Sequence, residues 1–256
     1  MKMMKSTYYI AVIALVSFFA ACTKNSAKIP YVLTDQPSKA LLKINYESPY
    51  FANPNVQLKL NDVRVSNIIN YRSPFPGGGL NTLGNSLPDY LEVNPGSVKL
   101  SVAMPKAGTD IDSANVYSTT LSLEGGKYYI AHITDTAANT QTVLQTQDIS
   151  KVDSGFSKYT FVNLMPNVAA IDVYFGTTVV APNVPYKGIS NVFQLGFTNA
   201  NAWAIRPAGA APTSTALATY AVGSVPNQRI FTVFAIGYSG AVDAVRKPYV
   251  SLVFAR

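Results

Sequence analysis

The sequence has little of the chemistry on which most catalytic and metal sites depend. Its 256 residues include one cysteine, one histidine and three glutamates, and charged side chains make up only 13%. A single cysteine excludes an intrachain disulfide framework and a cysteine-rich zinc site, and a single histidine excludes a multi-histidine cluster. The low charged fraction is also atypical of a disordered polar chain.

The charge balance is basic, with 20 lysines and arginines against 13 acids and a formal net charge of +7. The basic residues are scattered along the chain, whereas a nucleic-acid surface needs a concentrated basic stripe with aromatics between the charges. We therefore expect no nucleic-acid partner.

The N-terminus has the layout of a secretory signal peptide. Lys2 and Lys5 precede an uncharged apolar run over residues 8–19, and small residues follow it. The run is shorter than the roughly 20 residues that a membrane-spanning helix requires. We assign residues 1–21 to a signal peptide.

The motif Phe19-Ala20-Ala21-Cys22 resembles a bacterial lipobox. The resemblance implies cleavage before Cys22, a diacylglycerol on its sulfur and an acylated N-terminus, which together give a firm membrane anchor. Residues 22–39 then form a tether. We expect an outer-membrane lipoprotein of a Gram-negative envelope; its periplasmic or surface orientation stays open.

Beyond the tether, alternating apolar and polar residues between turn signals predict an all-β protein, and no helical period persists for three turns. The predicted strands of the first half are residues 42–46, 56–60, 90–93, 98–102, 119–123, 127–134 and 140–146. Those of the second half are residues 159–164, 170–175, 192–197, 202–206, 217–222, 230–236 and 249–254.

The two halves can be aligned with an offset that falls from 118 to 102 residues along the chain, which indicates a domain duplication rather than a solenoid. We predict two tandem β-sandwiches, over residues 40–147 and 158–256, joined by a linker at residues 148–157. The alternative is one closed sheet of about 14 strands.

The second half carries the segments Tyr159-Thr160-Phe161-Val162-Asn163-Leu164-Met165-Pro166-Asn167, Ala170-Ile171-Asp172-Val173-Tyr174-Phe175-Gly176 and Val184-Pro185-Tyr186. These resemble the opening of a domain of unknown function, family 4397 (DUF4397). The first half shows the same plan in residues 43–49, 56–60 and 90–96. The resemblance implies an extracytoplasmic immunoglobulin-like or transthyretin-like β-sandwich, often in tandem, with no assigned reaction.

No catalytic constellation stands out. A Ser-His-Asp site would have to use His132, which lies in the middle of a predicted strand, and no G-x-S-x-G motif exists. A glycosidase pair would draw on Glu92 or Glu124, both beside predicted turns. We therefore predict that the protein is not an enzyme and has no cofactor and no metal site.

Aromatic residues give the remaining functional hint. Tyr46, Tyr50, Phe51, Tyr71 and Phe75 lie within thirty residues, in or beside predicted loops. Exposed rings of this kind stack on sugars, although a β-sandwich core uses the same residue types.

We name Tyr71 and Phe75 as candidate ligand-binding residues, because residues 74–79 read as a mobile surface loop. The predicted function is a lipid-anchored envelope module for binding or adhesion, with envelope proteins or glycans as partners. The alternative is a glycan-binding accessory lipoprotein of a carbohydrate-uptake system.

Overall fold

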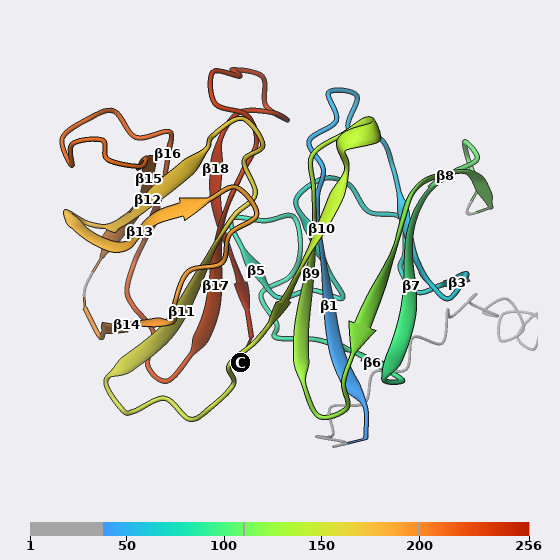
Figure 1. Cartoon of the computed structure of the whole chain (residues 1–256), viewed down its shortest axis with the longest axis horizontal. Coiled ribbons are helices and arrows are strands. Elements are labelled where there is room, and N and C mark those ends of the chain that lie inside the picture. Colours follow the sequence, from blue (N-terminus) through green and yellow to red (C-terminus); the bar gives the residue numbers. More distant parts are fainter. Residues whose placement is uncertain (1–37, 110, 199, 256) are drawn as a thin grey trace, which may run out of the picture. The chain divides into compact units, whose positions relative to one another are not determined.

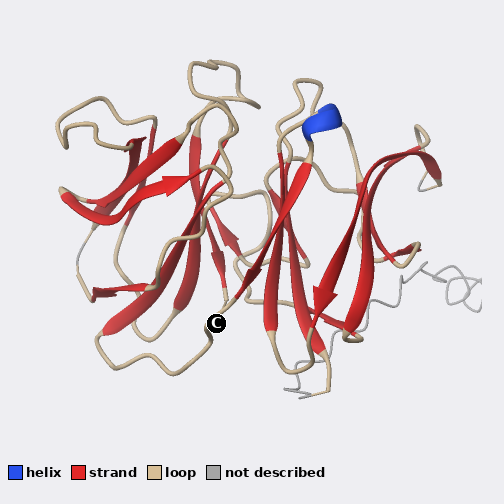
Figure 2. Ribbon diagram, viewed as in Figure 1, coloured by secondary structure: helices blue, strands red, loops and turns tan. Residues whose placement is uncertain are grey.

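The computed structural model describes residues 38–255 apart from residues 110 and 199, and strands dominate that part of the chain (Figures 1 and 2). The described helical structure is a single 3-10 turn, η1, over Ala137–Asn139. No described helix has the length and apolar character that crossing a membrane requires. The predicted signal peptide, Cys22 and most of the tether lie outside the described residues.

The first sandwich pairs two sheets. One has the order β10-β9-β1-β4, with β6 also paired to β1, and the other has the order β3-β2-β7-β8. The strands are β1 (Ala40–Glu47), β2 (Gln57–Leu60), β3 (Val63–Arg64), β4 (Ser73–Phe75), β6 (Leu91–Val93), β7 (Gly96–Pro105), β8 (Asp112–Leu123), β9 (Tyr128–Thr134) and β10 (Gln141–Thr146).

The second sandwich combines a sheet of order β14-β11-β17-β18-β5 with a sheet of order β13-β12-β15-β16. Its strands are β11 (Phe156–Asn163), β12 (Ala170–Phe175), β13 (Thr178–Pro185), β14 (Phe193–Gly196), β15 (Asn201–Pro207), β16 (Ala218–Val222), β17 (Ile230–Ile236) and β18 (Tyr249–Phe254), with β5 (Gly79–Leu80) added from the first half of the chain. Its core gathers around Trp203, Phe161 and Phe231.

The all-β prediction is confirmed, and four separate sheets replace the alternative of one closed sheet. Strands β12, β17 and β18 have the predicted bounds. Strand β13 was not predicted. It contains Pro182 and Pro185, which an edge strand such as β13 tolerates.

Strand β1 is buried on both faces, which its alternating pattern did not predict. Leu42, Ile44 and Tyr46 share one face, and Lys43 and Asn45 lie on the opposite one. An alternating strand usually exposes its polar face to water. Here that face is covered by other parts of the chain, so each polar side chain on it needs an internal partner.

An apolar cluster joins the central sheets of the two sandwiches, which belong to one compact unit. The cluster takes its side chains from both halves: Tyr71, Ile130 and Val143 from the first, and Val162, Leu164, Phe234, Ile236 and Val253 from the second. All of these are buried. The two sandwiches therefore share a hydrophobic layer of their own, besides their separate cores.

Beside this cluster runs a buried chain of hydrogen bonds, the polar relay, formed by Asn45, His132, Gln145, Thr232 and Gln147. The Asn45 amide donates to His132 Nδ1 at 3.0 Å, so Nε2 carries the proton and donates to Gln145 Oε1, also at 3.0 Å. Thr232 donates to Gln145 Oε1 at 3.2 Å and accepts from Gln147 Nε2 at 3.0 Å. The relay thus links three strands of the first sandwich to β17 of the second.

The segment predicted as a mobile loop over residues 74–79 instead forms β4 and β5, which corrects that expectation. Strand β5 pairs with β18 of the second sandwich, and Phe254 N donates to Gly78 O at 2.7 Å. Asn81 adds two bonds, donating to Val250 O at 2.7 Å and accepting from Ser251 Oγ at 2.8 Å. This segment, residues 73–81, is referred to as the insertion, and it ties the two halves together.

Lys43 of β1 is hydrogen-bonded to this insertion. Its side chain is fully buried, donates to Gly77 O at 2.8 Å and lies 4.8 Å from the centre of the Tyr90 ring. Burial lowers the pKa of Lys43 to about 7, against a smaller opposing influence of the Asp89 charge. Near pH 7, both the charged and the neutral form of the lysine are therefore populated.

Gly78 packs closely against the backbone of Leu87. Its φ is +88°, and a Cβ there would lie 2.3 Å from Leu87 O and 2.4 Å from Lys43 Nζ. Gly209 has a similar φ of +78° but open space around it. We predict that Gly209→Ala costs about 1 kcal/mol from backbone strain alone, and that Gly78→Ala costs at least about 2 kcal/mol. Urea unfolding of both variants measures the difference, and equal losses would contradict the packing described for Gly78.

Candidate functional site

Loops from both sandwiches meet at one end of the central strands. Strands β1 and β9 are parallel, so the loops that follow Glu47 and Thr134 leave the sheet at the same edge. Thr134 Oγ1 donates to Leu164 O at 2.8 Å. This bond places the end of β11, in the second sandwich, beside the end of β9. The tether enters at the other end of β1, which is 8 residues or about 26 Å away.

A hollow of about 310 Å³ lies among these loops and is lined by Pro49, Tyr50, Phe51, Thr136, Tyr238 and Arg246. We refer to it as the aromatic–arginine pocket. Its residues come from the loops after β1, β9 and β17. Sequence reasoning included Tyr50 and Phe51 among the clustered aromatics but missed Tyr238 and Arg246, because nothing local in the sequence links residues so far apart.

Phe51 and Arg246 form the exposed wall of the pocket. Phe51 is 69% exposed at a turn that Asn53 closes by donating its backbone N–H to Tyr50 O at 2.8 Å. The Arg246 guanidinium lies 4.8 Å from the centre of the Phe51 ring, and its Nε donates to Asp243 Oδ2 at 2.9 Å. Bonds from the Arg246 backbone and side chain lower the pKa of Asp243. The guanidinium is thus held in place by the carboxylate of Asp243.

Tyr50 and Tyr238 form the inner wall, and hydrogen bonds fix both rings. Tyr50 Oη accepts from the Ala137 backbone N–H at 2.6 Å. Tyr238 donates to Asp135 Oδ1 at 2.8 Å. These bonds tie the β9–β10 loop to both neighbouring loops, so the pocket is largely pre-formed.

Beneath the pocket is a buried polar group that lacks hydrogen-bond partners within the described part of the chain. It includes both carboxyl oxygens of Glu47, the hydroxyl of Tyr71 and Nε of Arg72. Burial raises the pKa of Glu47 well above its usual range, although the nearby Arg72 charge opposes the shift. Burial thus disfavours the charged form of the Glu47 carboxyl.

The structure places both candidate ligand residues in the interior. Tyr71 is 3% exposed and belongs to the apolar cluster between the sandwiches, and Phe75 is 4% exposed on β4. Rings buried in this way cannot stack on a sugar without unfolding their surroundings. The exposed ring in the same stretch of sequence is Phe51.

His132 and Glu124, which were considered for catalysis, lie apart from each other and each has a partner within the protein. His132 is fully buried in the polar relay, and burial lowers its pKa to about 4, with the Gln145 bond acting weakly the other way. Glu124 pairs with Lys127 at 2.7 Å in the turn between β8 and β9. In the described residues, no group of three or more His, Cys, Asp or Glu side chains comes together in a way that could hold a metal ion.

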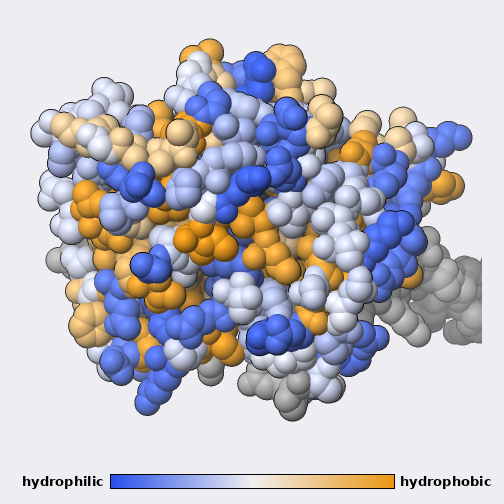
Figure 3. All heavy atoms as spheres, in the orientation of Figure 1, coloured by the Kyte–Doolittle hydropathy of each residue, from blue (hydrophilic) through white to orange (hydrophobic). Residues whose placement is uncertain are grey.

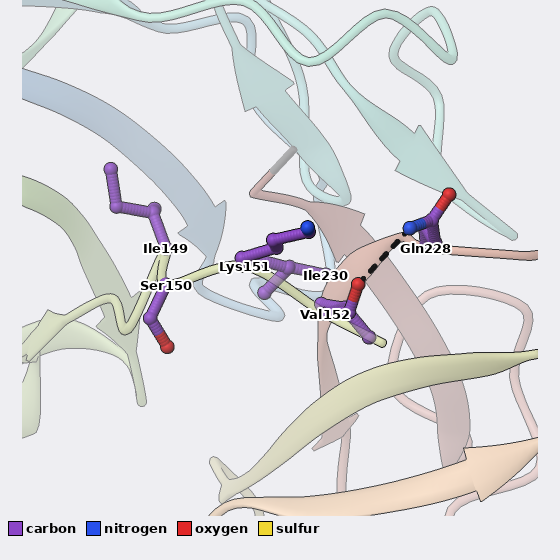
Figure 4. Close-up of a pocket in the computed structure, with 6 residues that line it drawn as sticks. All are labelled: Ile149, Ser150, Lys151, Val152, Gln228 and Ile230. Atoms are coloured by element: carbon purple, nitrogen blue, oxygen red, sulfur yellow. Dashed lines mark hydrogen bonds between the residues drawn. The ribbon is translucent and has the colours of Figure 1, made fainter. Parts of the chain in front are cut away.

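A second hollow, of about 370 Å³, lies where the stretch between β10 and β11 passes β17 (Figure 4). Its walls are Ile149, Ser150, Lys151, Val152, Gln228 and Ile230. Val152 and Ile230 form a small buried cluster with Ala255, and Gln228 donates to Val152 O at 3.2 Å. These contacts hold the connecting stretch against the second sandwich, which gives this hollow a structural role.

The family model of DUF4397, a domain of unknown function, matches residues 52–174 and residues 157–247. The chain belongs to the DUF4397 family. The two matched regions overlap and together include most strands of both sandwiches. The resemblance found in the sequence is thus confirmed at the level of the family.

No curated protein matches this DUF4397 chain. Among solved structures, it is similar to one described as alpha-glucan recognition by family 41 carbohydrate-binding modules from streptococcal virulence factors. That match has 12% identity and a TM-score of 0.24, and covers 82% of this chain and 96% of the other. A likeness at this level bears on neither the fold nor the ligand of the DUF4397 chain.

The buried histidine predicts a specific pH dependence. Burial lowers the pKa of His132 to about 4 in the folded protein, from an ordinary value of 6.5, so between these values the unfolded chain binds the extra proton. The contribution of neutral His132 to the free energy of unfolding is therefore complete above pH 6.5. It falls by about 3 kcal/mol as the pH approaches 4.

Urea midpoints at pH 7 and pH 4.5 for the wild type and His132→Gln provide the measurement. The glutamine retains a donor and an acceptor but does not titrate, so the wild type should lose more stability on acidification. Other groups, Glu47 included, contribute to both proteins and cancel in the comparison. An equal fall in the urea midpoint of the wild type and of His132→Gln would contradict a buried, neutral His132.

Proposed function

We propose that this DUF4397 protein is a non-catalytic binding module anchored by a lipid in the outer membrane. The supporting observation is the aromatic–arginine pocket, which lies at the end of β1 opposite the tether. In the chain, a lipid on Cys22 would precede the N-terminal end of β1, whereas the pocket follows its C-terminal end. The lipobox-like motif and the apolar run before it support the anchor.

The binding role rests on the composition of the pocket. Exposed apolar side chains are interspersed with hydrophilic ones on the face drawn in Figure 3, so exposure alone does not mark a site. Phe51 differs from an isolated exposed residue because an arginine and a hydrogen-bonded tyrosine converge beside it. A few fixed polar groups around an apolar surface are typical of ligand sites.

A non-catalytic role is supported by the placement of the titratable groups. His132 takes part in the polar relay, and Asp135 and Asp243 accept hydrogen bonds from Tyr238 and Arg246, which line the pocket. These contacts orient the pocket walls and leave no obvious nucleophile and base pair there.

The second candidate is a glycan-binding accessory lipoprotein of a carbohydrate-uptake system. It is favoured by the 69% exposure of Phe51, since an open aromatic face suits the apolar face of a sugar ring. Envelope proteins remain the competing partners.

The anchor predicts the fate of a cysteine variant. In a Gram-negative host, Cys22→Ala should accumulate as unprocessed precursor and incorporate no radiolabelled palmitate, because no other thiol exists in the chain. Thr23→Ala serves as the matched control and should be processed and labelled. Lipid incorporation into Cys22→Ala at the wild-type level would refute the anchor.

The pocket predicts that binding depends on Phe51. On an array of saccharides and peptides, Phe51→Ala should lower affinity for the bound ligand at least about tenfold, since hot-spot aromatics commonly contribute this much. Val242→Ala, on the β17–β18 loop and 93% exposed, should bind normally. Both substitutions are on the surface and should change stability by less than about 0.5 kcal/mol. Ligand binding that is indifferent to Phe51 would refute the proposed site.

A further inference from the structure

Strand β8 is the longest strand at the edge of a sheet in the described part of the chain. It has 12 residues and pairs with β7 alone, so its other edge has no strand partner within the described sheets. The remaining strands at the ends of the four sheet orders are shorter, from 2 residues in β3 to 8 residues in β13. Alternate N–H and C=O groups of such an edge point outward and form a template for a further strand.

The C-terminal part of β8 lacks the features by which proteins usually protect an edge, which are charges, prolines and bulges. Two register shifts interrupt the pairing with β7 before Tyr117, but the register is regular from Tyr117 to Leu123. This regular stretch contains no charged residue and no proline. In β13, the next longest edge strand, Pro182 and Pro185 interrupt the row of donors.

The side chains of the regular stretch form a symmetric pattern around its central residue, Thr120. The outer face carries exposed hydroxyl side chains at three alternate positions: Ser118, Thr120 and Ser122. The inner face begins with two half-buried residues and ends with two buried ones: Tyr117, Thr119, Leu121 and Leu123. A strand with this order, turned end to end, presents the same kinds of side chain on each face.

We propose that two copies of this chain pair through β8, antiparallel and about a twofold axis at Thr120. In this register Thr120 lies opposite Thr120 of the second copy, and Ser118 lies opposite its Ser122, so hydroxyls meet hydroxyls. On the inner face Tyr117 lies opposite Leu123. No like charges oppose each other within the stretch, because it has no charge.

The symmetric pattern is what favours a second copy over a strand of another protein. Each face of the stretch meets side chains of its own kind only when the added strand has the same sequence and runs in the opposite direction. The contact uses the same patch on both copies, so it closes after two chains and leaves no edge for a third.

This pairing goes beyond the proposed function, because it adds a second contact surface and does not involve the aromatic–arginine pocket. It reverses the second copy, so the N-terminal ends of the two β1 strands lie at opposite ends of the pair. Residues 22–39 have a maximum reach of about 60 Å, compared with a length of about 40 Å for β8. A lipid on each Cys22 is therefore compatible with pairing in one membrane.

Thiol crosslinking of the full chain, in membranes of a Gram-negative host, tests the pairing. Thr120→Cys should give a crosslinked dimer with a short bifunctional thiol reagent, because directly opposite Cβ atoms lie about 5 Å apart. In Ser118→Cys or Ser122→Cys alone, the two thiols lie about 14 Å apart and should crosslink at least about fivefold less. The double variant should crosslink again, because position 118 then faces position 122.

The matched control is Thr219→Cys, an exposed threonine on the edge strand β16. It should remain a monomer under the same conditions.

A charge variant tests the register in a second way. Thr120→Lys, added to the Ser118→Cys/Ser122→Cys variant, places two like charges directly opposite each other and should lower crosslinking at least about threefold. Thr219→Lys in the same background is the control and should change nothing. Both threonines are exposed, so the urea midpoints of the two lysine variants should agree.

The outcomes separate this inference from the proposed function. Absence of crosslinking in Thr120→Cys, equal crosslinking at positions 118, 120 and 122, or equal crosslinking in Thr219→Cys would overturn the pairing. Crosslinking of the wild type would instead reveal a free thiol on Cys22 and refute the lipid anchor. A specific excess in Thr120→Cys over that wild-type level would still support the pairing.

Discussion

The packing of one central sheet against the other is the constraint on which the rest of the structure depends. It buries the polar face of β1, so Lys43, Asn45 and Glu47 lie where an ordinary sandwich would meet water. A buried polar group without a partner is costly. The amide nitrogen of Asn45 finds its partner in the polar relay, and Lys43 bonds to a backbone carbonyl of the insertion. The insertion and the relay are therefore consequences of joining the two sandwiches.

The same packing creates the candidate site. The aromatic–arginine pocket draws Phe51 from the first sandwich and Arg246 from the second, so neither half could form it alone. Hydrogen bonds from Tyr238 to Asp135 and from Thr134 to Leu164 hold the two sets of loops together at this edge. Ligand recognition in the proposed function thus depends on a fixed orientation of the two repeats.

Much of the fold could be predicted from the sequence, because the period-2 pattern and the turn residues are local signals. Strands β12, β17 and β18 follow from them directly. The pattern could not show that the polar face of β1 is buried, since that depends on a sheet more than a hundred residues away. For the same reason Tyr71 and Phe75 looked like exposed loop aromatics, and Arg246 gave no signal. The predicted domain boundaries and the lipid on Cys22 stay predictions.

Equilibrium unfolding tests the coupling of the two repeats most directly. Trp203 is the only tryptophan of the chain and lies in the core of the second sandwich, whereas far-ultraviolet circular dichroism reports strands of both. If the shared layer and the relay make one cooperative unit, urea transitions followed by Trp203 fluorescence and by circular dichroism will coincide. If the circular-dichroism curve has two phases and the Trp203 fluorescence follows only one of them, the sandwiches unfold independently. That result would contradict the account.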